Sequence, residues 1–157
     1  MKISLLLTGK TDDANIQKAI AEYEKRLKFY VPFETIVIPA LKNIGALSHA
    51  QIKEKEGIAI SQHMEKADAA VLLDERGREF TSTEFAEFVQ SKMNAGTRHL
   101  MFVVGGAFGF SESVYKKAHA KIALSKMTFP HQMVRLVFAE QLYRAMTILK
   151  NEKYHHD

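Results

Sequence analysis

The sequence predicts an α/β fold with a mostly parallel sheet and helices on both faces of that sheet. Short apolar runs of strand length alternate with helical patterns along the whole chain. Each connection between two runs is long enough to hold a crossover helix, which parallel strands require. The runs are continuously apolar, as is typical of strands that are covered on both faces.

The apolar runs give the expected strands, which are residues 3–7, 33–38, 69–73, 100–104 and 120–124. All three prolines, Pro32, Pro39 and Pro130, stand at the boundary of an expected element. No repeat, low-complexity run or linker rich in Ser, Gly and Pro divides the sequence. We therefore expect one domain over residues 1–157.

Capping signals mark the starts of the helices between these strands. Asp12 and Asp13 precede apolar residues at helical spacing, namely Ile16, Ala19, Ile20, Tyr23 and Leu27. Ser48 opens a second helix. Thr81 and Glu84 form a capping box before a third, which carries Phe85, Phe88, Val89 and Met93 and is followed by Gly96 as its stop.

The last and longest helix is expected over residues 131–149, with Pro130 suited to its first turn. It is apolar over more than half of its circumference, through Val134, Leu136, Val137, Phe138, Ala139, Leu142, Tyr143, Ala145, Met146 and Leu149. A helix on the surface of a small monomer needs only one apolar stripe. We therefore expect this helix to pack on the sheet and on a second copy of the chain, which makes a homodimer.

The composition is that of an ordinary globular domain, with 157 residues, 46% hydrophobic and 25% charged. The absence of cysteine excludes iron–sulfur centres, cysteine zinc sites and thiol nucleophiles, and we expect no metal. The apolar run in MKISLLLTGK is too short for a signal sequence or a membrane span, so we expect a cytoplasmic protein that does not enter membranes.

The charge is concentrated near the C-terminus. Residues 1–110 carry 14 basic and 14 acidic side chains, whereas residues 111–157 carry 8 and 4, which accounts for the net charge of +4. Four of the seven histidines also lie in that last part. This pattern suggests an anionic partner such as RNA, although from the charge alone a solvated basic surface is the more ordinary explanation.

Three segments that follow strands are candidates for binding, because ligands of α/β sheets bind beyond the carboxyl ends of strands. They are residues 73–78 (LDERGR), 105–112 (GGAFGFSE) and 124–131 (LSKMTFPH). The glycines of the second segment allow close backbone approach to a ligand. Its spacing matches neither the Walker loop nor the G-x-G-x-x-G fingerprint, so a nucleotide-binding regulator of the flavodoxin-like kind is a weak alternative.

Several motifs resemble the RlmH-type family of SPOUT-class methyltransferases, which methylate N3 of a pseudouridine in 23S ribosomal RNA. They are VVGGAFGF, ALSKMTFPHQMVRLVFAEQLYRA and the closing NEKYHHD, together with the MKI start, AEYEKRL and KEKEG. The resemblance implies a deep trefoil knot in the C-terminal part, an exception to the rule against threaded chains. It also implies a homodimer and S-adenosyl-L-methionine as the methyl donor, contacted by Leu73, Gly105, Leu124, Ser125, Lys126, Met127, Thr128 and Phe129.

The resemblance also implies roles for the basic C-terminal residues. Candidate catalytic residues are His155, His131, Glu140, Arg144 and Tyr154, of which His155, then His131, then Glu140 are candidates to deprotonate N3. Candidate RNA contacts are Arg135, Arg144, Tyr154, His155 and His156. From the residues alone, Glu140 and Arg144 make an ordinary helix pair, His131 caps its helix or packs at its start, and the closing residues form a disordered tail.

Two functions therefore remain open from the sequence. The first is an enzyme that methylates 23S rRNA within the assembled ribosome, since no recognisable RNA-binding module is present to read naked RNA. The second is a non-catalytic RNA-binding factor that keeps the same fold and an inactive pocket. Binding of the methyl donor distinguishes the two.

Overall fold

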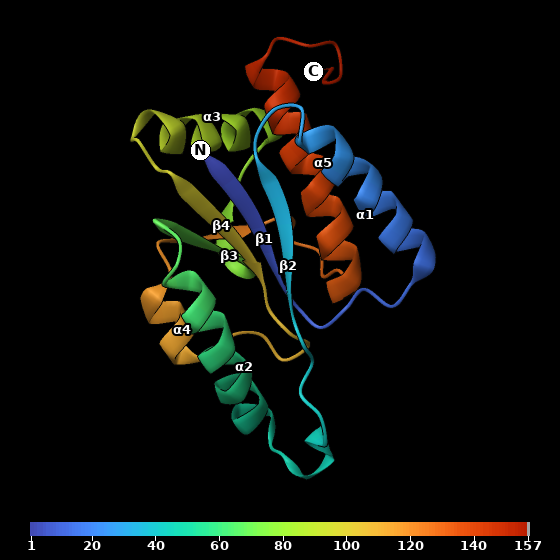
Figure 1. The fold of residues 1–157 in the computed structure, drawn as a ribbon, viewed down its shortest axis with the longest axis vertical. Coiled ribbons are helices and arrows are strands. Elements are labelled where there is room, and N and C mark those ends of the chain that lie inside the picture. Colours follow the sequence, from blue (N-terminus) through green and yellow to red (C-terminus); the bar gives the residue numbers. More distant parts are fainter. Residues whose placement is uncertain (157) are drawn as a thin grey trace.

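Five parallel strands form one sheet in the computed structural model, which describes residues 1–156 of the chain. The strands are β1 (Lys2–Thr8), β2 (Phe33–Ile38), β3 (Ala69–Glu79), β4 (His99–Val104) and β5 (Ala120–Ala123). Their order across the sheet is β2-β1-β4-β3-β5, and every neighbouring pair is parallel (Figure 1). The predicted α/β fold is confirmed, and the sheet is parallel throughout.

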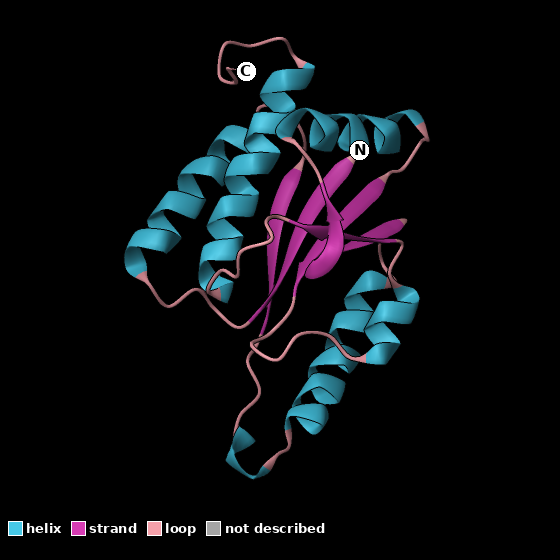
Figure 2. Ribbon diagram, turned by 180° about the vertical axis from the view of Figure 1, so that it is seen from behind, coloured by secondary structure: helices cyan, strands magenta, loops and turns pink. Residues whose placement is uncertain are grey.

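Helices cover both faces of this sheet, as predicted. They are α1 (Ala14–Leu27), α2 (His49–Met64), α3 (Ser82–Asn94), α4 (Glu112–Lys117) and α5 (His131–Leu149), with a short 3₁₀ turn at Ile44–Ala46. On one side α5 packs between α1 and α3, and on the other α2 packs with α4 (Figures 1 and 2). The segment that follows α5, up to residue 156, lies beyond the end of that helix, at the end of the sheet where β1 begins (Figure 1).

Each face of the sheet has its own hydrophobic core, because successive strand side chains point to opposite faces. Leu5 belongs to the core under α5, where the rings of Phe102 and Phe138 are 4.7 Å apart between centroids. Leu6, the next residue, belongs to the core on the other face, with Ile60 of α2. The continuous apolar strands are therefore explained by burial on both sides.

The predicted caps at the starts of α1, α2 and α3 are confirmed, whereas among the described residues no side chain caps the start of α5. The Asp13 carboxylate accepts hydrogen bonds from two backbone N–H groups at the start of α1. Ser48 caps α2, and Thr81 and Glu84 form the expected capping box at the start of α3. Gly96 ends α3 in the left-handed region, with φ of 78°, a conformation that favours glycine.

The third strand is longer than predicted. We expected it to end at Leu73, but β3 continues to Glu79 and pairs again with β5 at Arg78 after a break in register. This continuation requires Gly77, because a Cβ there would lie 2.5 Å from the backbone nitrogen of Ile122. No glycine signal in the sequence distinguishes this close crossing from an ordinary turn.

Candidate functional site

A cleft of about 430 Å³ lies at the carboxyl ends of β3, β4 and β5. Its lining includes Val104 and Ile122, from the ends of β4 and β5, and Leu73, the last residue of β3 before its break in register. The three segments predicted to bind a ligand therefore meet at one edge of the sheet. The volume falls in the range typical of small-molecule and cofactor sites, about 300–1,000 Å³.

Seven of the eight residues expected to contact the methyl donor line this cleft, namely Leu73, Gly105, Leu124, Ser125, Met127, Thr128 and Phe129. The exception is Lys126, whose side chain lies outside the cleft with Nζ 3.8 Å from the Glu79 carboxylate. The Ser125 hydroxyl accepts a hydrogen bond from the Met127 backbone N–H at 2.9 Å, which fixes a tight turn in this loop. The segment is therefore shaped locally before any ligand arrives.

The glycine turn after β4 forms a second wall of the cleft. The Gly109 N–H donates to the Gly106 carbonyl at 3.1 Å, and Gly109 has φ of 79°. A Cβ on Gly106 would collide with the carboxylate of Glu56, which packs against the back of the turn. Burial raises the pKa of Glu56, and one of its oxygens has no hydrogen-bond partner among the described residues.

A polar cluster of Asp74, Arg76 and Tyr115 on the cleft wall, with Lys121 beside it, contains residues that sequence reasoning did not single out. The Tyr115 hydroxyl donates a short hydrogen bond to Asp74, which also accepts from the Arg76 backbone N–H at 2.8 Å. Burial, with a contribution from Asp74, raises the pKa of Tyr115 to about 12. Arg76 and Lys121 lie over its ring. Asp74 and Arg76 stand in a predicted binding segment, whereas no pattern pointed to Tyr115.

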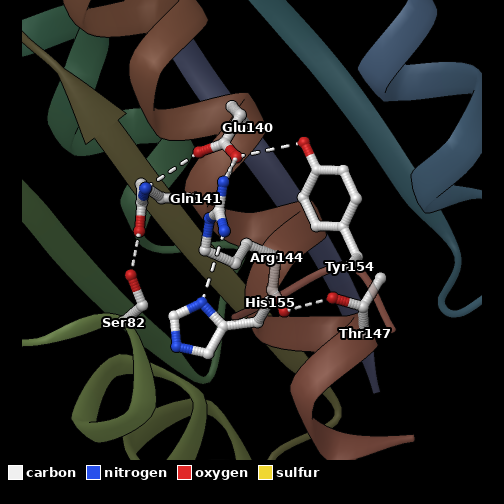
Figure 3. A network of polar contacts seen from close by, with 7 residues as sticks. All are labelled: Ser82, Glu140, Gln141, Arg144, Thr147, Tyr154 and His155. Atoms are coloured by element: carbon white, nitrogen blue, oxygen red, sulfur yellow. Dashed lines mark hydrogen bonds and ion pairs between the residues drawn. The ribbon is translucent and has the colours of Figure 1, made fainter. Parts of the chain in front are cut away.

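A second group of expected functional residues forms a polar network at the other end of α5 (Figure 3). Arg144 donates from Nε and Nη2 to the same oxygen of Glu140, at 3.0 and 2.5 Å. The Tyr154 hydroxyl donates to that oxygen at 3.2 Å, and Nη1 of Arg144 lies 3.3 Å from Nδ1 of His155. Because a guanidinium only donates, Nδ1 of His155 accepts in this arrangement.

The tail is thus folded back onto α5. The Tyr154 ring packs edge-on against Tyr143, at 4.8 Å between centroids, and Arg144 lies 4.9 Å above the Tyr154 ring. The hydrogen bond to Glu140 raises the pKa of Arg144, and burial raises the pKa of Tyr154. His156 is exposed, and Asp157 lies outside the described residues. Glu140 and Arg144 are therefore more than an exposed helix pair.

The structure brings together Glu140, Arg144, Tyr154 and His155 but separates them from the cleft. His131 lines the cleft at the start of α5, and Arg144 lies thirteen residues further along. At a rise of about 1.5 Å per residue, Arg144 lies about 20 Å along the helix axis from His131 within one chain. The predicted helix over residues 131–149 already implies this separation, but sequence reasoning treated the C-terminal residues as one group.

Arg135 does not fit the expected contact with RNA. Its side chain is 0% exposed and donates to the carbonyl oxygens of Thr8 and Gly9, at 2.8 and 3.0 Å, and to the Thr11 hydroxyl at 3.0 Å. Burial lowers the pKa of its guanidinium. Arg135 therefore connects the start of α5 to the loop after β1, and it is unavailable to a partner at the surface.

Among residues 1–156, no group of three or more His, Asp or Glu side chains is arranged to hold a metal ion. Within the same range, no helix is both long and apolar enough to cross a bilayer.

Comparison with known proteins identifies the family. Residues 1–155 match the family described as "Predicted SPOUT methyltransferase". The chain is 57% identical over 157 residues to "Ribosomal RNA large subunit methyltransferase H" of Parabacteroides distasonis, covering 100% of both chains. It is 53% identical over 156 residues to the protein of the same name from Flavobacterium johnsoniae, covering 99% of both.

A solved structure supports the fold alone. It is that of a probable methylase family protein from Haemophilus influenzae Rd KW20, with a TM-score of 0.56 and 15% identity, covering 97% of this chain and 67% of that one. The family match over nearly the whole chain, the identity above 50% and the parallel sheet with a cleft at its carboxyl edge agree. The chain therefore belongs to the SPOUT methyltransferase family.

Proposed function

We propose that the protein uses S-adenosyl-L-methionine to methylate N3 of a pseudouridine in 23S ribosomal RNA, on the assembled ribosome in the cytoplasm. The observation that carries the proposal is the single cleft in which three separate, sequence-predicted segments meet. The names of relatives at 50–57% identity support ribosomal RNA as the substrate class. Family membership also implies a deep trefoil knot around the cleft segments.

The residues of the cleft fit this methyl donor. Leu124, Phe129 and Ile122 offer apolar surface for an adenine ring and an aliphatic chain, and Ser125 and Thr128 add hydroxyl groups. At Gly105 an added Cβ would lie 3.0 Å from the ring of Phe110, so glycine lets this ring, which also lines the cleft, pack against the loop. Such an apolar lining with a few polar groups is typical of cofactor sites.

When bound, the donor's sulfonium supplies the methyl group to be transferred. The chain must align the attacking nitrogen with the methyl carbon and sulfur, exclude water and remove the proton from N3. We assign donor binding to the residues that line the cleft and deprotonation to His155, His131 or Glu140, in that order. Glu140 is the least available of these, because it accepts hydrogen bonds from Arg144, Gln141 and Tyr154.

A homodimer would bring the first turn of α5 in one copy near the last turns of α5 in the other copy. The outward face of α5 carries the half-buried apolar residues Met133, Leu136 and Val137. An antiparallel contact between two copies of α5, centred on Leu136 and Val137, would bring Arg144 of one copy toward His131 of the other. The network of one chain would then complete the cleft of its partner.

In this arrangement the exposed or half-buried residues of the last turns of α5 and of the tail contact RNA. Arg144 would bind phosphate or uracil oxygens, Tyr154 would stack on a base, and His155 and His156 would extend the contact. Arg135 is assigned a positioning role instead, because it holds the start of α5 against the loop that contains Gly9.

Thermal shift with S-adenosylmethionine and S-adenosylhomocysteine, compared with ATP and NAD, tests the cofactor directly. A ligand that binds only the native state raises the midpoint, by an amount that grows with its concentration over Kd. We expect a selective rise with the first two ligands. No rise at millimolar concentration, or a rise only with ATP or NAD, would reject the methyltransferase function.

Deletion of residues 154–157 tests the tail. We expect loss of methyl transfer to ribosomes with cofactor affinity kept within a few-fold, and unchanged turnover would reject the role of the tail. Light scattering tests the dimer, since a monomer at assay concentrations would leave the cleft without the network. Equal turnover on protein-free rRNA and on ribosomes would reject the assembled ribosome as the preferred substrate.

A further inference from the structure

Phe108 is an exposed aromatic residue at the tip of the glycine turn. Its side chain is 38% exposed and forms part of the lining of the cleft. The turn that carries it is closed by the bridge between Gly106 and Gly109 and is backed by Glu56. The ring is therefore held at the cleft by a constrained turn, although hydrophobic burial alone would favour an inward position.

A second ring supports Phe108 from outside the cleft. His49, the first residue of α2, stacks on Phe108 with 4.0 Å between ring centroids and an interplanar angle of 22°. His49 is not among the residues that line the cleft. The two rings, which we call the aromatic platform, thus form a stacked pair of which one member reaches the cleft.

Basic side chains lie near the platform, as expected for a site that binds a nucleic acid. Lys53, one helical turn after His49 on α2, lines the same cleft, as does Arg76. Aromatic rings beside basic side chains are the usual arrangement for binding unstacked bases, because every base has a π-face and every nucleotide a phosphate.

We propose that the aromatic platform stacks on an unpaired base of the RNA substrate and so positions the target nucleotide at the cleft. The inference rests on the proposed function and adds a binding site that lies outside the expected donor contacts. A base is favoured over the adenine of the methyl donor, because Phe108 is exposed and its supporting ring lies outside the cleft.

Steady-state methylation of large ribosomal subunits that lack the methyl group tests the platform. We expect Phe108→Ala to raise KM for the subunits about ten-fold or more, consistent with the loss of one base stack. Phe108→Trp should keep KM near the wild-type value, because stacking needs an aromatic face. Phe108→Leu should raise KM as Phe108→Ala does. His49→Ala should give an intermediate increase.

The matched control is Phe29→Ala, since Phe29 is also an exposed phenylalanine, at 83%, and does not line the cleft. This variant should keep the wild-type KM. Binding of S-adenosylhomocysteine, measured by calorimetry, should change by less than two-fold in Phe108→Ala, and urea unfolding should show that every variant is folded.

The outcomes separate the two proposals. An active wild-type protein with an unchanged KM in Phe108→Ala, or full rescue by Phe108→Leu, would overturn the platform and leave the proposed function standing. A ten-fold loss of cofactor affinity in Phe108→Ala would assign the ring to the methyl donor and also overturn the platform. A wild-type protein that transfers no methyl group to the subunits would overturn both.

Discussion

Replacement of Gly77 by alanine should strongly destabilise the protein and damage the cleft. A Cβ at this position would lie 2.5 Å from both the backbone nitrogen and the carbonyl carbon of Ile122, and 2.6 Å from the carbonyl carbon of Lys121. Ordinary contacts between such atoms are about 3.5–4.0 Å, so the two backbones would have to separate by about 1 Å. The obstructing atoms belong to β5, and no side-chain rotation can relieve the clash.

The magnitude follows from the kind of strain. Overpacking in a well-packed interior costs typically about 1–3 kcal/mol and occasionally more. Because three backbone atoms clash at once, we expect Gly77→Ala to lower the free energy of unfolding by about 3 kcal/mol or more. The same movement would displace Ile122 from the cleft wall, so the thermal shift with S-adenosylmethionine should also be lost.

Two other glycines provide matched controls for urea unfolding followed by circular dichroism. Gly45 has no atom within 4 Å of an added Cβ, so Gly45→Ala should be neutral or stabilising by about 0.4–1 kcal/mol. Gly96 has equal space but φ of 78°, so Gly96→Ala should cost about 1 kcal/mol from backbone strain alone. If Gly77→Ala were as stable as Gly45→Ala, the close crossing of β3 and β5 would be refuted.

Three further predictions concern the core, the buried arginine and acid stability. Phe138→Ala should cost about 3–5 kcal/mol in urea unfolding, because its fully buried ring packs on Phe102, and a loss below 1 kcal/mol would contradict this packing. Arg135→Ala should cost about 3 kcal/mol in the same assay, since it leaves two backbone carbonyls without their donor, and Arg135→Lys should recover only part of that loss. Backbone N–H groups, chiefly that of His99, lower the pKa of Asp68. The ionised Asp68 carboxylate therefore stabilises the fold at pH above its unfolded-state pKa of about 3.9. This stabilisation is lost as the pH falls through the lower pKa that Asp68 has in the folded state. Asp68→Asn should accordingly flatten the acid limb of the stability curve, and an unchanged limb would refute the assignment.

The sequence by itself determined the order of the strands and helices along the chain and the three segments that supply most of the cleft lining. Asp13, Ser48 and Thr81 cap helices through side chains that act within three residues of their own position, so their signals are readable locally. Parallel strands also bring their carboxyl ends to one edge, which is why the segments after residues 73, 104 and 123 could be expected to meet.

Only the tertiary structure decided where the long-range contacts fall. Arg135 and Arg144 are both basic residues of one helix, yet the first donates to carbonyls of Thr8, at the end of β1, and Gly9, and the second binds Glu140 and the tail. The side chain of Lys126 likewise lies outside the cleft that its neighbours line. Helical periodicity fixes the direction in which each side chain leaves the helix, but the groups that it meets come from segments up to 127 residues away. Those partners, and the approach of β5 to Gly77, are set by packing of the whole chain.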